Sequence, residues 1–187
     1  MSLGWFKKKE GVPIRPPKAA NPRPPGNVPK PGGGISGLLS EDLIVISPPK
    51  LGKEKLIELL VRKLCERRSL GKPGPFLDKV LEREQGVSTT LDTGLAVPHA
   101  RVDGLPSVAA ILGLIPQGLP DPKQPDLMIR VMFLFLSPNR QEVFTEHLHL
   151  LRGVSTLFQT PFIESILKAP TPAAALEFIR SKEASSA

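Results

Sequence analysis

The chain has 187 residues, and 40% of them are hydrophobic, which is enough for one domain with a real hydrophobic core. Tyrosine is absent and aromatic residues make up 5%, so we expect an aliphatic core. The single cysteine, Cys65, excludes an intrachain disulfide and fits a reducing compartment. The longest apolar run, residues 131–136, is too short to span a bilayer, and the opening residues lack the apolar segment of a signal peptide. We therefore expect a soluble, cytoplasmic protein.

The formal net charge of +7 is concentrated at the start of the chain. Residues 1–40 carry a net charge of +6, whereas residues 41–187 carry +1. A strongly basic domain would indicate a nucleic-acid partner. Because the excess charge lies outside the apolar part of the chain, no nucleic-acid partner is expected.

Residues 1–39 are rich in proline, glycine and lysine, with eight prolines between Pro13 and Pro31. Such a composition cannot bury enough apolar surface to offset the entropy lost on ordering. We predict a disordered tail over 1–39 and a folded domain over 40–187. Trp5 and Phe6 precede three lysines, a composition suited to an anionic membrane surface, although a solvated chain end is the plainer interpretation.

The first half of the domain alternates strand and helix patterns. Residues 43–46 predict a short strand, and 53–67 place apolar residues at helical spacing. A second helix is predicted over 75–84, followed by strand character over about 95–99.

The second half contains two further apolar strands, at 107–115 and 128–136, on either side of a proline-rich segment. The second of them is almost continuously apolar, which is typical of a strand buried on both faces. Helices are predicted over 141–158, about 161–168 and 172–181. The alternation predicts an α/β fold: an α/β/α sandwich with a central mixed β-sheet flanked by helices.

His99 follows Pro98 at the end of the strand predicted over 95–99, among small residues that let another group approach closely. A neutral imidazole is a nucleophile near neutral pH. Upstream, Arg83 ends a predicted helix, and Ser88 and Thr89 follow it. An arginine fork and hydroxyl donors are groups that bind a phosphoryl group. A packed histidine with a structural partner is the alternative.

The helix predicted over 141–158 turns His147 inward on its apolar stripe and His149 toward solvent. A zinc site built from both histidines is therefore disfavoured, and no metal is predicted. Taken alone, His147 fits a core histidine with a satisfied hydrogen bond.

The stretch R-E-x(3)-S-T-x(4)-G-L-A-V-P-H-A, from Arg83 to Ala100, resembles the enzyme IIA component of the bacterial phosphoenolpyruvate-dependent sugar phosphotransferase system. It is similar to the mannitol/fructose class, which includes a nitrogen-regulatory relative. The resemblance extends to two other parts of the chain: E-H-L-H-L-L at 146–151, and the opening of the domain, L-L-S-E-D-L-I followed by K-x-x-L-I-x-x-L. The resemblance therefore covers about residues 40–182.

The resemblance implies a phosphoryl carrier that needs no cofactor. His99 matches the phosphorylated histidine, with the phosphoryl group on Nε2, and His147 matches the second active-site histidine. Arg83 matches the arginine that neutralises the phosphate, while Ser88 and Thr89 match a hydroxyl pair in the phosphate-binding loop. The histidine-containing phosphocarrier protein would be the donor and an enzyme IIB the acceptor.

Three alternatives remain open at this point. The domain could be a regulatory relative whose phosphorylation controls protein targets without sugar transport. It could be a binding module that acts through its basic tail. A metal hydrolase built on the three histidines comes last, because His149 points away from the other two.

Overall fold

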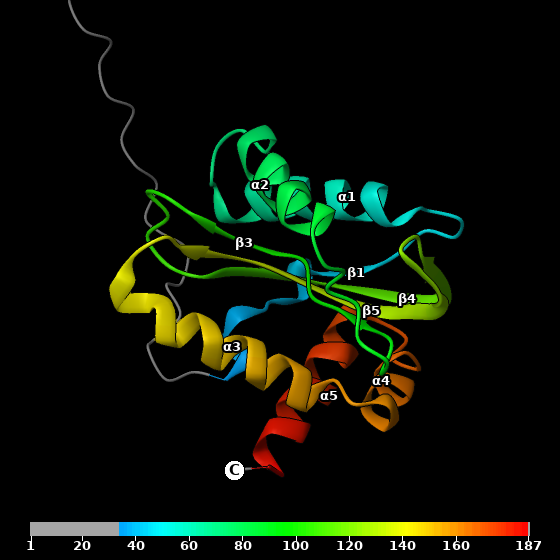
Figure 1. Cartoon of the computed structure of the whole chain (residues 1–187). Coiled ribbons are helices and arrows are strands. Elements are labelled where there is room, and N and C mark those ends of the chain that lie inside the picture. Colours follow the sequence, from blue (N-terminus) through cyan, green and yellow to red (C-terminus); the bar gives the residue numbers. More distant parts are fainter. Residues whose placement is uncertain (1–33, 187) are drawn as a thin grey trace, which may run out of the picture.

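The computed structural model describes residues 34–186, so residues 1–33 of the predicted tail lie outside the described residues. Five strands form one mixed sheet with helices on both faces (Figure 1). The predicted α/β/α sandwich is confirmed. The tail boundary at residue 39 stays a prediction. Ile35–Leu38 form a short 3-10 helix, η1, and both Ile35 and Leu39 are buried in the core.

The sheet is organised around its longest strand, β5. The strands are β1 (Ile44–Ile46), β2 (Leu95–Ala96), β3 (His99–Val102), β4 (Ala109–Asp121) and β5 (Gln124–Pro138). Their order is β1-β4-β5-β2, with β3 also paired to β5. β4 and β5 are antiparallel, whereas β1 on β4, and β2 and β3 on β5, are parallel pairs. β5 therefore holds together the two halves of the sheet.

The hairpin of β4 and β5 is longer than the sequence predicts. The proline-rich segment 116–128 continues both strands, and Asp121 pairs with Gln124 at the turn. The pairing register shifts between Leu114 and Leu119, where Gly118 has a φ of 73° that glycine adopts without strain. This irregularity lets a strand pair continue through a segment whose prolines cannot donate hydrogen bonds.

The strand predicted over 95–99 is divided into β2 and β3. Leu95 pairs with Val131 and His99 with Phe135, so both short strands follow β5 in one register. The break falls at Pro98, which has no N–H to donate, although its carbonyl accepts a bond from the Phe135 amide at 3.2 Å. His99 thus opens a new strand directly beside β5.

Five α-helices cover the two faces of the sheet. They are α1 (Lys53–Arg68), α2 (Gly74–Gln85), α3 (Phe144–Leu157), α4 (Thr160–Ile166) and α5 (Pro172–Ala184). α1 and α2 lie on one face, and α3, α4 and α5 lie on the other (Figure 1). The predicted helices are confirmed, except that 141–158 begins with a 3-10 turn, η3 (Gln141–Val143). No helix within residues 34–186 is long and apolar enough to cross a membrane.

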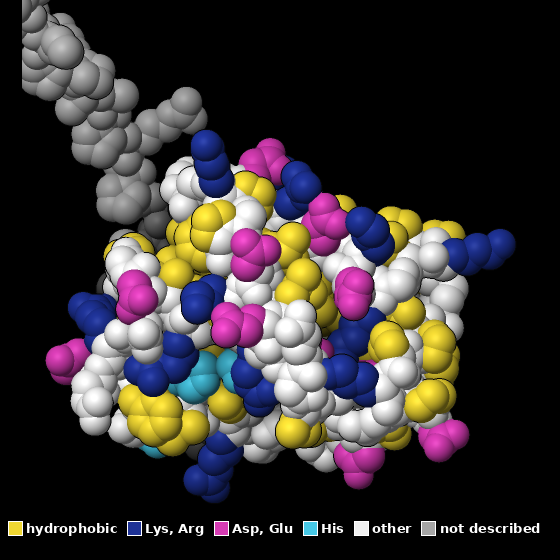
Figure 2. Space-filling view, turned by 45° about the horizontal axis from the view of Figure 1, so that its top comes forward, with side chains coloured by type: hydrophobic (Ala, Val, Ile, Leu, Met, Phe, Trp, Pro, Cys, Tyr) yellow, Lys and Arg dark blue, Asp and Glu magenta, His cyan; other side chains and the backbone are white. Residues whose placement is uncertain are grey.

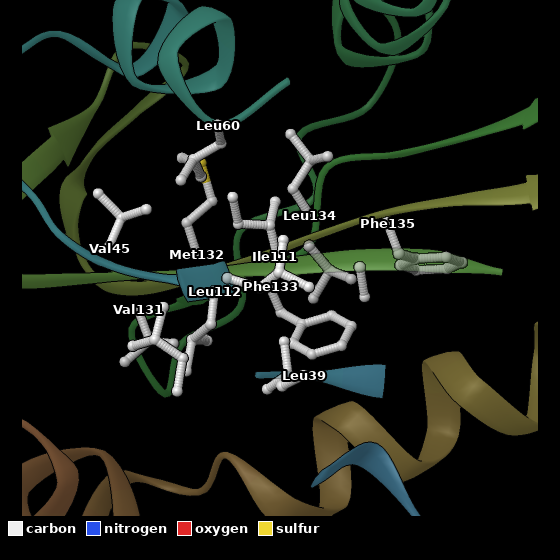
Figure 3. Packing of buried hydrophobic residues seen from close by; sticks show 14 of the residues in the cluster. Leu39, Val45, Leu60, Ile111, Leu112, Val131, Met132, Phe133, Leu134 and Phe135 are labelled. Atoms are coloured by element: carbon white, nitrogen blue, oxygen red, sulfur yellow. The ribbon is translucent and has the colours of Figure 1, made fainter. Parts of the chain in front are cut away.

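The core forms on both faces of β5, because successive side chains point in opposite directions. Met132 lies toward Leu60 of α1, while Phe133 points to the opposite face (Figure 3). Phe133 is fully buried and its ring centroid lies 6.2 Å from those of Phe135 and Phe158. The core is mostly aliphatic, as predicted, but these phenylalanines are among its largest fully buried side chains.

We expect Phe133→Ala to lower the free energy of unfolding by about 3–5 kcal/mol, because it leaves a cavity between β5 and α3. Urea denaturation of the purified protein measures this loss. Phe178→Ala is the control: Phe178 is 41% exposed, so its truncation should cost about 1 kcal/mol or less. Equal losses in the two variants would contradict the assignment of Phe133 to the central core.

Candidate functional site

His99 is the first residue of β3 and is partly buried. Its Nδ1 lies 2.8 Å from the carbonyl oxygen of Val97. Because a carbonyl oxygen can only accept, Nδ1 carries the proton in this bond, and the neutral ring keeps a free lone pair on Nε2. The ring of Phe135 stacks on the imidazole at 5.3 Å with an interplanar angle of 12°. The side chain is thus fixed in orientation with one nitrogen available for reaction.

The surroundings of His99 favour its neutral form. Burial lowers the pKa of His99, and the positive charge of Arg83 lowers it further. The bond to Val97 and the charge of Glu84 act in the opposite direction, but the pKa remains below its ordinary value. At neutral pH the imidazole is therefore uncharged, which is the form that can act as a nucleophile.

His147 lies on α3 with 6% of its surface exposed, and its ring centroid is 5.3 Å from that of His99. Its Nδ1 is 2.7 Å from Oγ of the buried Ser137. Burial lowers the pKa of His147 to about 4, with contributions from His99 and Arg101. The inward orientation predicted from the apolar stripe is confirmed, and His149 is exposed as predicted.

Arg83 lies in the last turn of α2, exposed to solvent, and its Nη1 donates to the Val87 carbonyl at 3.3 Å. It is close enough to lower the pKa of His99. Figure 2 shows histidine side chains at the surface of this face, with basic and hydrophobic side chains beside them. Within residues 34–186, no group of three or more His, Cys, Asp or Glu side chains is placed to hold a metal ion.

Ser88 and Thr89 lie in the loop between α2 and β2, and their hydroxyls are bound to carboxylates. Ser88 donates to Asp121 at 2.9 Å, and Thr89 donates to Glu84. The Thr89 carbonyl also accepts from the Val97 amide at 3.1 Å, so the loop runs directly behind the His99 strand. A phosphate-binding role for these two residues stays a prediction. Their hydroxyl protons are engaged elsewhere.

The carboxylates that hold this loop belong to a buried ionic cluster around Lys53. The Lys53 ammonium, 6% exposed, lies 2.8 Å from both Glu84 Oε2 and Asp121 Oδ2. Its Nζ also lies 3.3 Å from the hydroxyls of Ser88 and Thr90. Burial alone would raise the pKa of Asp121, but the hydrogen bonds that its carboxylate accepts from Lys53, Thr90, Ser88 and the Lys123 amide hold it well below its usual range.

The Lys53 cluster joins four parts of the chain. It connects the start of α1, the end of α2, the loop at 88–90 and the turn of the β4–β5 hairpin. Lys123 in that turn adds a bond to the Gly86 carbonyl at 2.9 Å, just beyond α2. Because Glu84 is adjacent to Arg83, the cluster fixes the end of the helix that carries this arginine.

Three residues at the site, Lys53, Phe135 and Arg101, were not expected from the sequence. Lys53 stands three and four residues before Leu56 and Ile57, so extending the apolar stripe of α1 by one turn would have marked it as buried. Arg101 follows His99 by two residues on one strand, which places both on one face. The stacking of Phe135 under His99 depends on strand pairing and has no local sequence signal.

Comparisons with known proteins place the chain in one family. The family model described as "Phosphoenolpyruvate-dependent sugar phosphotransferase system, EIIA 2" matches residues 37–182. A curated relative from Haloferax volcanii, the "PTS system fructose-specific EIIA component", is 26% identical over 136 residues, which is 72% of this chain and 87% of that protein.

Solved structures show the same fold. The nitrogen regulatory protein IIA-Ntr from Neisseria meningitidis superposes with a TM-score of 0.67 at 22% identity, covering 78% of this chain and 98% of that one. IIA mannitol from Escherichia coli superposes with a TM-score of 0.64 at 21% identity, covering 75% and 98%. A further similar structure is a complex of enzyme IIAMtl with phosphorylated enzyme IIBMtl from Escherichia coli, with a TM-score of 0.64 at 19% identity, covering 76% of this chain and 97% of that one.

The family match defines an enzyme IIA domain of the phosphotransferase system, as the sequence resemblance predicts, and the solved structures share its fold. The chain belongs to the phosphoenolpyruvate-dependent sugar phosphotransferase system EIIA 2 family, and it is a phosphoryl carrier of that system.

The lowered pKa of His147 predicts that stability depends on pH. Unfolding returns this imidazole to its ordinary pKa of about 6.5, so between about pH 6.5 and pH 4 the unfolded chain binds a proton that the folded protein does not. We expect the free energy of unfolding, measured in urea, to rise with pH across this window. His147→Gln should reduce that slope, and an unchanged slope in the variant would assign the effect to other groups.

Lys53→Met should lower the free energy of unfolding by about 3–5 kcal/mol, because it leaves two buried carboxylates without their cation. Urea denaturation at neutral pH measures the change. Lys55→Met is the matched control on the same helix: its side chain is 73% exposed, so we expect a change of about 0.5 kcal/mol or less. A Lys53 variant as stable as this control would show that the Lys53 cluster contributes little to the fold.

Proposed function

We propose that His99 is the residue that carries the phosphoryl group. The observation that carries this proposal is the hydrogen bond from Nδ1 to the Val97 carbonyl, which leaves Nε2 with a free lone pair. The lowered pKa of His99 keeps that nitrogen unprotonated at neutral pH. A fixed, neutral imidazole beside the exposed Arg83 has the properties that phosphoryl transfer requires.

The donor is the histidine-containing phosphocarrier protein. The lone pair on His99 Nε2 forms a new P–N bond while the P–N bond of the donor phosphohistidine breaks and its electron pair returns to the donor nitrogen. The proton on His99 Nδ1 remains hydrogen-bonded to Val97 throughout. In the second half of the cycle this new P–N bond breaks in turn, as the nucleophile of an enzyme IIB bonds to phosphorus.

Four other residues, two of them in the loop at 88–90, support the transfer. Arg83 stabilises the negative charge on the equatorial phosphoryl oxygens, because its guanidinium is close enough to act electrostatically on His99. His147 supplies a neutral imidazole at a ring distance of 5.3 Å, where its Nε2 can contact the phosphoryl group. Its Nδ1 is already bound by Ser137, which fixes the ring. Ser88 and Thr89 contribute through the loop that they hold in place.

The surface around the histidine pair suits docking of a protein. Phe144 and Leu148 are 44% and 48% exposed on α3, beside His147. Exposed apolar side chains next to a reactive group favour contact with another protein surface. The IIAMtl protein of similar fold is described in a complex with phosphorylated IIBMtl, and we infer an enzyme IIB as the acceptor here. The fructose-specific relative supports a role in sugar transport.

The decisive experiment is intact-mass measurement after incubation with phosphoenolpyruvate, enzyme I and the phosphocarrier protein. Wild type should gain one acid-labile phosphoryl group, and His99→Ala should gain none because the accepting nitrogen is lost. His149→Ala is the matched control and should be phosphorylated normally. A phosphorylated His99→Ala protein would reject His99 as the carrier.

Arg83→Ala should remain folded but accept the phosphoryl group at least about tenfold more slowly. The same intact-mass measurement, taken as a time course, gives this rate.

A separate experiment identifies the acceptor by adding an enzyme IIB to the phosphorylated wild-type protein. Loss of the phosphoryl group from wild type supports a role in transport. A phosphoryl group that is retained, with binding to another protein that depends on it, would instead support the regulatory role.

A further inference from the structure

A second arginine lies at the histidine pair. Arg101 is on β3, two residues after His99, so the two side chains project from the same face of the strand. That face is the one covered by α3, because His99 stacks on Phe135 and contacts His147. Arg83 belongs to α2 on the other face of the sheet. The two arginines therefore lie in opposite layers, Arg83 acting on His99 and Arg101 on His147.

The Arg101 guanidinium is held in place on two sides. Its Nη2 donates to the carbonyl of Arg140 at 3.0 Å, and its central carbon lies 5.1 Å from the centroid of the Phe144 ring. The Phe144 ring in turn lies parallel to the His147 imidazole, at 6.5 Å with an interplanar angle of 6°. The guanidinium is thus fixed beside the second histidine.

The charge of Arg101 lacks a protein counterion. Within residues 34–186 no carboxylate forms a salt bridge with Arg101, and the same holds for Arg83. The Nε of Arg101 is buried and has no hydrogen-bond partner in the described part of the chain. A buried, unpaired donor on a charged group is costly unless an anion arrives to satisfy it.

We propose that Arg101 is a second phosphoryl-binding residue, which contacts the phosphoryl oxygens from the α3 side while Arg83 contacts them from the α2 side. This inference rests on the proposed role of His99. A phosphoryl group in transit spreads negative charge over three equatorial oxygens, and two guanidinium forks from opposite sides can bind more of them than one.

The test is the single-turnover rate of transfer from the phosphorylated phosphocarrier protein at saturating donor concentration. Arg101→Gln should lower this rate about ten- to a hundredfold, which is the effect of losing charge-assisted hydrogen bonds to the transition state. Arg152→Gln is the matched control, because it removes an exposed arginine of α3 and should leave the rate unchanged. A rate within twofold of wild type in Arg101→Gln would overturn the proposal.

Two further readouts separate a phosphoryl contact from other roles. If Arg101→Gln raises only the donor concentration needed for half-maximal rate, Arg101 is a docking residue and the proposal fails. Arg101→Lys keeps the charge and the packing on Phe144 but lacks the fork, so we expect a rate between those of wild type and Arg101→Gln. It also provides the test if the glutamine variant does not fold, and a wild-type rate in Arg101→Lys would equally overturn the fork contact. Failure of wild type itself to accept phosphate would reject the role of His99 instead.

Discussion

The site depends on β5, a strand buried on both faces that pairs with β4 on one side and with β2 and β3 on the other. Phe135 of this strand stacks on His99, and Ser137, two residues on, holds Nδ1 of His147. One face of one strand therefore orients both imidazoles. Because β3 is registered on β5 by main-chain hydrogen bonds, the relative position of the two histidines follows from sheet geometry and not from a flexible loop.

On the other face of the sheet, the Lys53 cluster fixes the positions of the end of α2 and of the loop at 88–90. It places one ammonium between two carboxylates and satisfies the remaining oxygens with hydroxyl and backbone donors. A buried ionic group of this kind is tolerated only when its partners are in place, so it penalises arrangements in which α2 or the loop at 88–90 is displaced. The hydroxyls of Ser88 and Thr89, for which the sequence resemblance implies phosphate binding, are thereby engaged in holding the loop.

Features set by residues close together in the sequence could be predicted, whereas features set by contacts between distant parts of the chain could not. Apolar periodicity located the five α-helices of residues 34–186 and turned His147 inward, because burial on a helix is a local property of spacing. The same periodicity, carried one turn further, would have found Lys53. The extended hairpin was missed because its prolines oppose strand formation locally, whereas pairing between Leu119 and Ile129 stabilises it from a distance. The proximity of Arg101 to His147 likewise arises only when β3 and α3 pack together.

Because the two histidines are neutral, the charge of the docking face depends on whether a phosphoryl group is bound. In the unloaded protein, uncharged imidazoles lie among arginines, so this part of the surface is positive. A phosphoryl group brings close to two negative charges near neutral pH, which is about the charge needed to cancel two guanidinium groups. The docking face would then be positive in the unloaded form and close to neutral in the loaded form, while its shape stays the same. A partner protein could distinguish them by charge alone, and dissociate once the transfer has changed it.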